Sequence, residues 1–198
     1  MPNESTPESA PESAPAAQTI TSATMPQPMR EQRDDNGRRI AVTFESAHPP
    51  FPSAANDSWL VAIDGSEHAM NALAMAERLS TEAGVRVLDL VNVQPWLSKE
   101  AANHELAPRG WAIAADACAK LGAKDFAWRL HILMGEPARR IVEQAEALGS
   151  RGIVIGARGL TATEALLIGS VALRVIHTAH GSVLVVRHPE PFGKLPQR

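Results

Sequence analysis

The chain has 198 residues, a formal net charge of −3, a single cysteine and 44% hydrophobic residues. One cysteine excludes an intramolecular disulfide and any cysteine-rich metal site. No run approaches the roughly 18 apolar residues of a membrane span, and no basic region ahead of an apolar stretch marks a secretory signal. We therefore expect a cytoplasmic protein that makes no membrane contact.

The N-terminal part of the chain differs in composition from the rest. Residues 1–57 hold nine of the fifteen prolines and carry a net charge of −4, whereas residues 58–198 carry +1. A Pro-rich, acidic segment with few large apolar residues is typical of disorder. We predict a disordered tail over 1–57, one domain over 58–188 and a short tail over 189–198. The patch at 38–44 (RRIAVTF) is the one part of the first tail that could order, as a strand packed on the domain.

The domain alternates strand-like and helix-like patterns and is near neutral, so nothing in it marks a nucleic-acid surface. Apolar runs end at turn residues or proline, and helical patterns begin at capping residues and end at glycine. Residues 96–110 are predicted as a loop with at most a short helix. The predicted strands are 59–63, 85–93, 126–133, 152–155 and 182–186, and the predicted helices are 66–81, 111–121, 137–148, 162–168 and 171–178.

This alternation predicts an α/β fold with a five-stranded parallel sheet, because helical crossovers join parallel strands. In doubly wound sheets, ligands bind outside the carboxyl ends of the strands, near the point where the strand order reverses. The loops after the first, second and fourth predicted strands are therefore the candidate site. They carry Asp64, Val93-Gln94 and a glycine-rich stretch.

The loop after the fourth strand carries Gly156-Ala157-Arg158-Gly159, then nine residues, then Gly169-Ser170-Val171. Glycine lets a backbone approach a ligand closely, and a helix N-terminus attracts anions. We expect Ser170 to cap the last helix. The pattern is either a phosphate-binding cradle or a glycine-rich connection that only permits tight turns. Neither the Walker nor the dinucleotide fingerprint occurs.

The G-x-x-G, nine residues, G-S-V pattern resembles the nucleotide-binding signature of the universal stress protein family. The stretch 61–66 (VAIDGS) resembles that family's first strand and following turn. The stretches 135–138 (GEPA) and 182–186 (SVLVV) resemble its third helix start and its last strand. The resemblance covers residues 58–188.

The resemblance implies a sheet of order 3-2-1-4-5 with helices on both faces, and an ATP site between strands one and four. Asp64 matches the acid that holds the ribose, Val93 the residue beside the adenine, and the glycines and Ser170 the phosphate contacts. Mg²⁺ or Mn²⁺ could bind through the phosphates. The implied site residues are Ala62, Ile63, Asp64, Val93, Ile155, Gly156, Arg158, Gly159, Gly169, Ser170 and Val171.

Two of these residues have a structural role as an alternative to ligand binding, and a third position departs from the family pattern. Asp64 either meets a ligand or caps the helix at Ser66, and Arg158 either binds phosphate or lies solvated. Ala172 stands where some family members have a hydroxyl, which removes one phosphate contact.

Two residue pairs and one cysteine outside the cradle also have both a functional and a structural interpretation. His177 and His180 either bind a metal or complement a helix dipole. Cys118 is either a buried apolar residue, which we expect, or a reactive thiol. Trp96 and Trp111 either shield an adenine or pack the loop between them.

Three functions are open at this point. The first is an ATP-binding regulatory module in a stress response, the second a slow metal-assisted ATPase or phosphotransferase, and the third a dimerisation module with a vestigial site. The resemblance implies a homodimer through the last strand, at Val183, Leu184, Val185 and Val186. Alternatively the N-terminal segment, at Ile40 to Phe44, covers that edge.

Overall fold

The computed structural model describes residues 25–51, 58–159 and 168–187. The described strands are β1 (Arg30–Arg33), β2 (Arg39–Glu45), β3 (Trp59–Ala62), β4 (Val87–Gln94), β5 (Ala127–Met134), β6 (Gly152–Gly156) and β7 (Val183–Val186). The described helices are α1 (Glu67–Glu82), α2 (Lys99–Gly122), α3 (Pro137–Leu148) and α4 (Ser170–Thr178).

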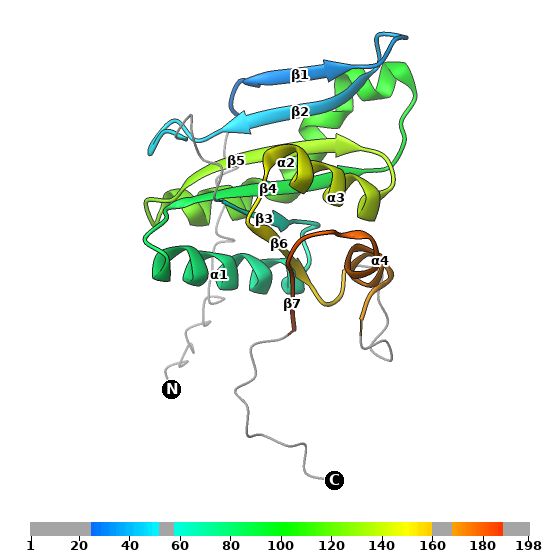
Figure 1. The fold of residues 1–198 in the computed structure, drawn as a ribbon. Helices are drawn as coiled ribbons and strands as arrows, with labels where there is room; N and C mark the ends of the chain where they lie inside the picture. The colour runs from blue at the N-terminus through cyan, green and yellow to red at the C-terminus, as the bar shows by residue number, and fades with distance from the viewer. Residues whose placement is uncertain (1–24, 52–57, 160–167, 188–198) are drawn as a thin grey trace, which may run out of the picture.

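In the part of the chain that the structure describes, the strands form one seven-stranded sheet of order β1-β2-β5-β4-β3-β6-β7 (Figure 1). The five strands from β5 to β7 run parallel in the expected order. The expectation of a purely parallel, five-stranded sheet is wrong, because β1 and β2 extend it as an antiparallel hairpin.

Helices cover both faces of the sheet. One core cluster joins α1 and α2 to one face, and a second joins α3 and α4 to the other. Strands β3 and β6 are apolar on both faces, as a parallel strand between two helical layers requires. Each βα loop therefore emerges at the same edge of the sheet, where the site lies.

The hairpin corrects the prediction of disorder for residues 30–45. Val42 and Phe44 are fully buried, and the Phe44 ring lies 5.7 Å from that of Trp111 on α2. At the turn, the Asp34 carboxylate accepts hydrogen bonds from the backbone N–H groups of Asn36 and Arg38. The Pro-rich average over 1–57 hid this short alternating strand. The strand at 38–44 does form, but on β5 rather than beside β7.

Helix α2 is twice as long as the pattern predicted, so the expectation of a loop over 96–110 is wrong from Lys99 onward. Ser98 caps the helix by accepting a hydrogen bond from Ala101 N at 3.2 Å. Pro108 lies inside the helix on its exposed side, where the lost hydrogen bond is offset by burial of Leu106 and Gly110 on the other side.

Two smaller expectations concern the last helix. Ser170 is the first residue of α4 rather than its cap; Gly169 occupies the capping position and contributes no side-chain hydrogen bond. The short helix predicted over 162–168 falls almost wholly outside the described residues, as do the tails at 1–24 and 189–198.

Candidate functional site

The strand order reverses around β3. Strand β4 lies on one side of it and β6 on the other, and the crossover through α3 changes the face of the sheet. The carboxyl ends of these three strands meet the start of α4. This is the place where doubly wound sheets bind their ligands.

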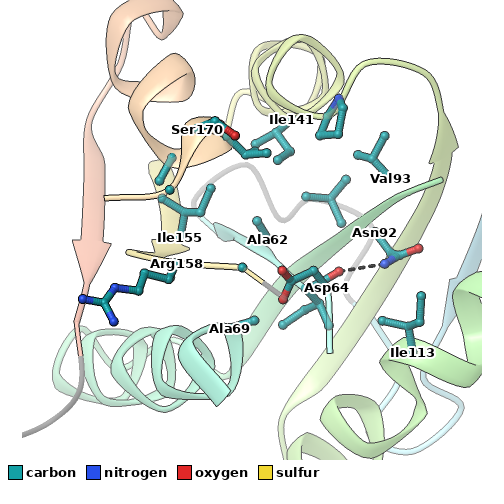
Figure 2. A pocket seen from close by; sticks show the side chains of 18 of the residues that line it. Ala62, Asp64, Ala69, Asn92, Val93, Ile113, Ile141, Ile155, Arg158 and Ser170 are labelled. Carbon is teal, nitrogen blue, oxygen red and sulfur yellow. Dashed lines mark hydrogen bonds between the residues drawn. The ribbon is translucent and has the colours of Figure 1, made fainter. Parts of the chain in front are cut away.

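A cavity of about 510 Å³ opens at this edge (Figure 2). That volume suits a nucleotide-sized ligand. All eleven residues implied by the resemblance line it, drawn from four separate segments of the chain. They are Ala62, Ile63, Asp64, Val93, Ile155, Gly156, Arg158, Gly159, Gly169, Ser170 and Val171. The structure thus brings them together; whether each contacts a ligand stays a prediction.

Asp64 follows β3 and serves the local turn as well as the cavity. Its Oδ1 accepts a hydrogen bond from Ser66 N at 2.9 Å. The cap of α1 is Ser66 itself, whose Oγ accepts from Ala69 N at 3.1 Å. Asp64 therefore orients the turn, while its carboxylate also lies on the cavity wall (Figure 2).

Gly159 brings the loop after β6 against this carboxylate. A Cβ added to Gly159 would lie 2.6 Å from Asp64 Oδ2, closer than real side chains approach. The absence of a side chain at Gly159 therefore lets the loop lie against Asp64. A ligand held by Asp64 would then also lie beside this loop.

Gly156 is small for another reason. A Cβ there would meet the backbone of α1, with His68 C at 2.6 Å and Ala69 N at 2.9 Å. Glycine at this position lets β6 pack against the first turn of α1. Its requirement is therefore explained by packing, without any ligand.

The start of α4 completes the cavity. Gly169 N donates to Ala157 O at 2.7 Å, which ties the helix to the end of β6. The next N–H groups, at Ser170 and Val171, have no partner within the helix and can receive an anion. The Arg158 side chain extends away from Asp64 and Ser170 in Figure 2, so only its backbone position fits the phosphate role as drawn.

Sequence reasoning placed Gln94 in a candidate loop but gave it no role, and it missed Asn92 on the same strand. Asn92 is 2% exposed and Gln94 is 7% exposed, and both line the cavity. Their signal was visible as polar residues at alternate positions near the carboxyl end of an apolar strand. Ile113 on α2 and Ile141 on α3 also line it, and depend on helix packing that the sequence pattern does not show.

The other candidates take structural roles. Trp111 packs in the core against Phe44 and Trp128, whereas Trp96 is 64% exposed beneath the Arg38 guanidinium. Burial raises the pKa of the Cys118 thiol far above its usual range, as expected for a buried apolar residue.

The metal interpretation of the C-terminal histidines finds no support in the described residues. They contain no cluster of three His, Cys, Asp or Glu side chains suited to a metal ion. His180 instead pairs with Glu146 at 2.9 Å, and His177 lies in the last turn of α4.

Within the described ranges, no helix has the length and apolar character to cross a membrane.

The fold and the site define an α/β domain with a ligand cavity at the switch point of its sheet. The model of the universal stress protein family matches residues 56–187, and the chain belongs to that family.

Relatives of known family agree. The universal stress protein MJ0531 of Methanocaldococcus jannaschii is 32% identical over 145 residues, which is 66% of this chain and 82% of the relative. A universal stress protein of Thermus aquaticus is 33% identical over 135 residues, covering 65% of this chain and 96% of the relative.

Solved structures share the fold. The structure of the hypothetical protein MJ0577 superposes with a TM-score of 0.55 at 26% identity, covering 69% of this chain and 99% of that one. A universal stress protein from Archaeoglobus fulgidus gives a TM-score of 0.55 at 26% identity, covering 65% and 96%.

Proposed function

We propose that this universal stress protein binds ATP in the cavity at the carboxyl edge of its sheet and acts as a regulatory module in a stress response. One observation carries the proposal. A carboxylate, a helix N-terminus and an apolar strand end converge on one cavity of nucleotide size. The carboxylate suits a ribose, the helix N-terminus suits an anionic phosphate chain, and the apolar strand end suits a flat base.

The charges of the cavity support binding more than rapid chemistry. Asp64 and Arg158 are the charged side chains among the described lining residues, and no lysine is among them. Mg²⁺ or Mn²⁺ would then join through the phosphates. Slow hydrolysis through the metal and backbone donors is the alternative, since phosphoryl transfer depends on electrostatic stabilisation.

Ala172 bears on the vestigial alternative. It is 3% exposed and packs in the core shared by α3 and α4, so its methyl group belongs to the packing of α4. The missing hydroxyl removes one phosphate contact and leaves the backbone donors of α4 in place.

Two solved structures of the same fold are complexes with nucleotides. One is a universal stress protein in complex with cAMP, at 24% identity, and the other is the Archaeoglobus fulgidus protein with dAMP, at 23%. At these identities they speak for the fold, and the support for ATP here comes from the cavity. The proposal places the protein in the cytoplasm, where ATP is available.

Calorimetry with ATP and Mg²⁺ tests the proposal directly. Asp64→Asn keeps an acceptor for Ser66 N and removes the charge, so we expect the turn to survive. ATP affinity should fall about tenfold to a hundredfold, the value of a hydrogen bond to a charged group. Asp116→Asn is the matched control, on exposed α2 surface beside Lys120.

Stability gives a second measurement. A hundredfold excess of ATP over its Kd should raise the free energy of unfolding by about 2.7 kcal/mol.

Mass spectrometry of any small molecule that leaves the purified protein on denaturation would identify a retained ligand. No heat and no thermal shift at millimolar ATP with Mg²⁺ would refute ATP binding. ADP formation that Asp64→Asn abolishes would instead favour the ATPase.

We further propose a homodimer through β7, with Val183, Leu184, Val185 and Val186 at the interface. The support is that β7 ends the sheet on that side in the described residues, while the N-terminal hairpin covers the opposite edge. Val183, Leu184 and Val185 are only partly buried in the single chain. An apolar edge strand of this kind readily pairs with another strand.

A further inference from the structure

A chain of hydrogen bonds at the β4 side of the cavity has a direction set by a backbone carbonyl. Asn92 Nδ2 lies 2.8 Å from Ile63 O, and that oxygen can only accept (Figure 2). The amide nitrogen of Asn92 must therefore face it. Asn92 Oδ1 is then the acceptor that meets Gln94 Nε2 at 2.6 Å.

This chain of hydrogen bonds, from Gln94 through Asn92 to Ile63 O, determines which atom of the Gln94 side-chain amide is left for a ligand. With Nε2 held by Asn92, the carbonyl oxygen Oε1 is the remaining acceptor. No donor among residues 25–51, 58–159 and 168–187 is hydrogen-bonded to it. Gln94 is 7% exposed and lines the cavity. An acceptor in a residue so largely shielded from bulk water gains free energy from a ligand that brings an N–H group to it.

A glutamine amide can normally turn over and accept or donate as its partner demands. Here a flip would place Oε1 against Asn92 Oδ1, and two acceptors repel. The orientation of Gln94 is thus fixed before the ligand arrives. Fixed polarity in a buried site discriminates strongly against a ligand of the opposite polarity.

We propose that Gln94 selects a purine with an amino group at position 6 over one with a carbonyl there, and so favours adenine over hypoxanthine and guanine. The inference rests on the proposed ATP binding and adds the residue that distinguishes the base. Gln94 directly follows Val93 at the end of β4, where the base is expected. The adenine N6 amino group would donate to Oε1, whereas the O6 atom of a 6-oxopurine would face it as a second acceptor.

Calorimetry with ATP and inosine triphosphate on the full chain tests this. The two ligands share the ribose and the three phosphates, so their affinity ratio reports the base alone. We expect the unmodified protein to bind ATP about tenfold more tightly, the value of one hydrogen bond. In Gln94→Met, which keeps the length and removes the acceptor, the ratio should fall below about threefold, mainly through weaker ATP binding.

Gln32→Met is the control, because it makes the same substitution on exposed β1. It should leave the ratio unchanged. Equal affinity of the unmodified protein for both nucleotides would overturn the role of Gln94, and this result needs no variant to fold. An unchanged ratio in a folded Gln94→Met variant would do the same. Failure of both nucleotides to bind would refute the proposed function itself.

Discussion

Gly156, at the end of β6, and Gly159, in the loop after it, are required for different reasons. Gly156 lies against the backbone of α1, where neither partner can move aside without shifting a whole element. Gly159 lies against the Asp64 carboxylate, the end of a side chain that can rotate. Neither residue has a positive φ, so the absent Cβ itself carries the argument in both cases.

This contrast predicts separable effects of alanine at the two positions. Gly156→Ala should lower the free energy of unfolding by about 1–3 kcal/mol, the usual cost of overpacking. Gly159→Ala should leave stability within about 1 kcal/mol and weaken ATP binding, because it displaces Asp64. Urea unfolding and calorimetry measure the two effects. Gly181→Ala, where an added Cβ meets nothing within 4 Å, is the control. Equal loss of stability at 156 and 159 would contradict this assignment.

A buried charge cluster joins β4 to β5 away from the cavity. Asp89 is fully buried and accepts hydrogen bonds from Arg129 Nε at 2.7 Å and His131 Nε2 at 2.8 Å. Ser58 Oγ donates to its other oxygen. Burial by itself would raise the pKa of Asp89, but the hydrogen bonds from His131, Arg129 and Ser58 hold it below the ordinary value.

The lowered pKa of Asp89 predicts a pH-dependent stability difference. The carboxylate stabilises the fold fully above the unfolded pKa of about 3.9, and that contribution is lost as the pH falls through the lower folded pKa. Asp89→Asn should therefore cost about 3–5 kcal/mol at pH 7, and the difference should narrow below about pH 4. Urea unfolding from pH 7 to pH 3 measures it. A small, pH-independent difference would contradict the role of the charge.

At the scale of elements, the N-terminal hairpin is part of the domain core rather than an appendage. Its turn contacts the loop after β4, where the Arg38 guanidinium lies 5.5 Å from the centre of the Trp96 ring. Asn103 on α2 accepts hydrogen bonds from Arg33 Nη1 and Arg39 N. The hairpin also removes β5 from the edge of the sheet, which reduces the risk of unwanted strand pairing.

Phe44→Ala tests how far the hairpin is integrated. Phe44 is fully buried against Trp111, so its truncation should cost about 3–5 kcal/mol by urea unfolding. Met29→Ala, at a side chain 61% exposed just before β1, should change stability by less than about 0.5 kcal/mol. A cost under 1 kcal/mol at Phe44 would mean that the hairpin is only loosely attached.

The sequence predicted the elements whose signals are local. Ser66 and Gly149 mark the ends of their helices, and the apolar run at β3 marks a buried strand. The strand at 38–44 was only a possibility from the sequence, because its partner, β5, lies more than eighty residues away in the chain. The first half of α2 was taken for a loop because Pro108 masks a buried stripe that only tertiary packing reveals. The position of Gln94 at the candidate edge was predicted, but its role was not, because it depends on the direction of a chain of hydrogen bonds, which no spacing shows.

At the scale of the molecule, the two edges of the sheet differ. One ends in β1, whose residues Arg30 to Arg33 are exposed and polar, and such edges resist pairing. The other ends in β7, and the neighbouring α4 exposes Leu173 at 47% and Ile176 at 42%. The asymmetry points any self-association to the β7 side.

The proposed dimer can be tested at one backbone group of β7. Ser182 O and Val186 O accept hydrogen bonds from β6, so by alternation the N–H of Val185 faces the open edge. Val185→Pro removes that donor and leaves the ladder with β6 intact, whereas Val185→Ile keeps it. Light scattering should give twice the chain mass for the unmodified protein and Val185→Ile, and the chain mass for a folded Val185→Pro. A dimer that survives Val185→Pro would place the interface elsewhere, and a monomer in all three would refute it.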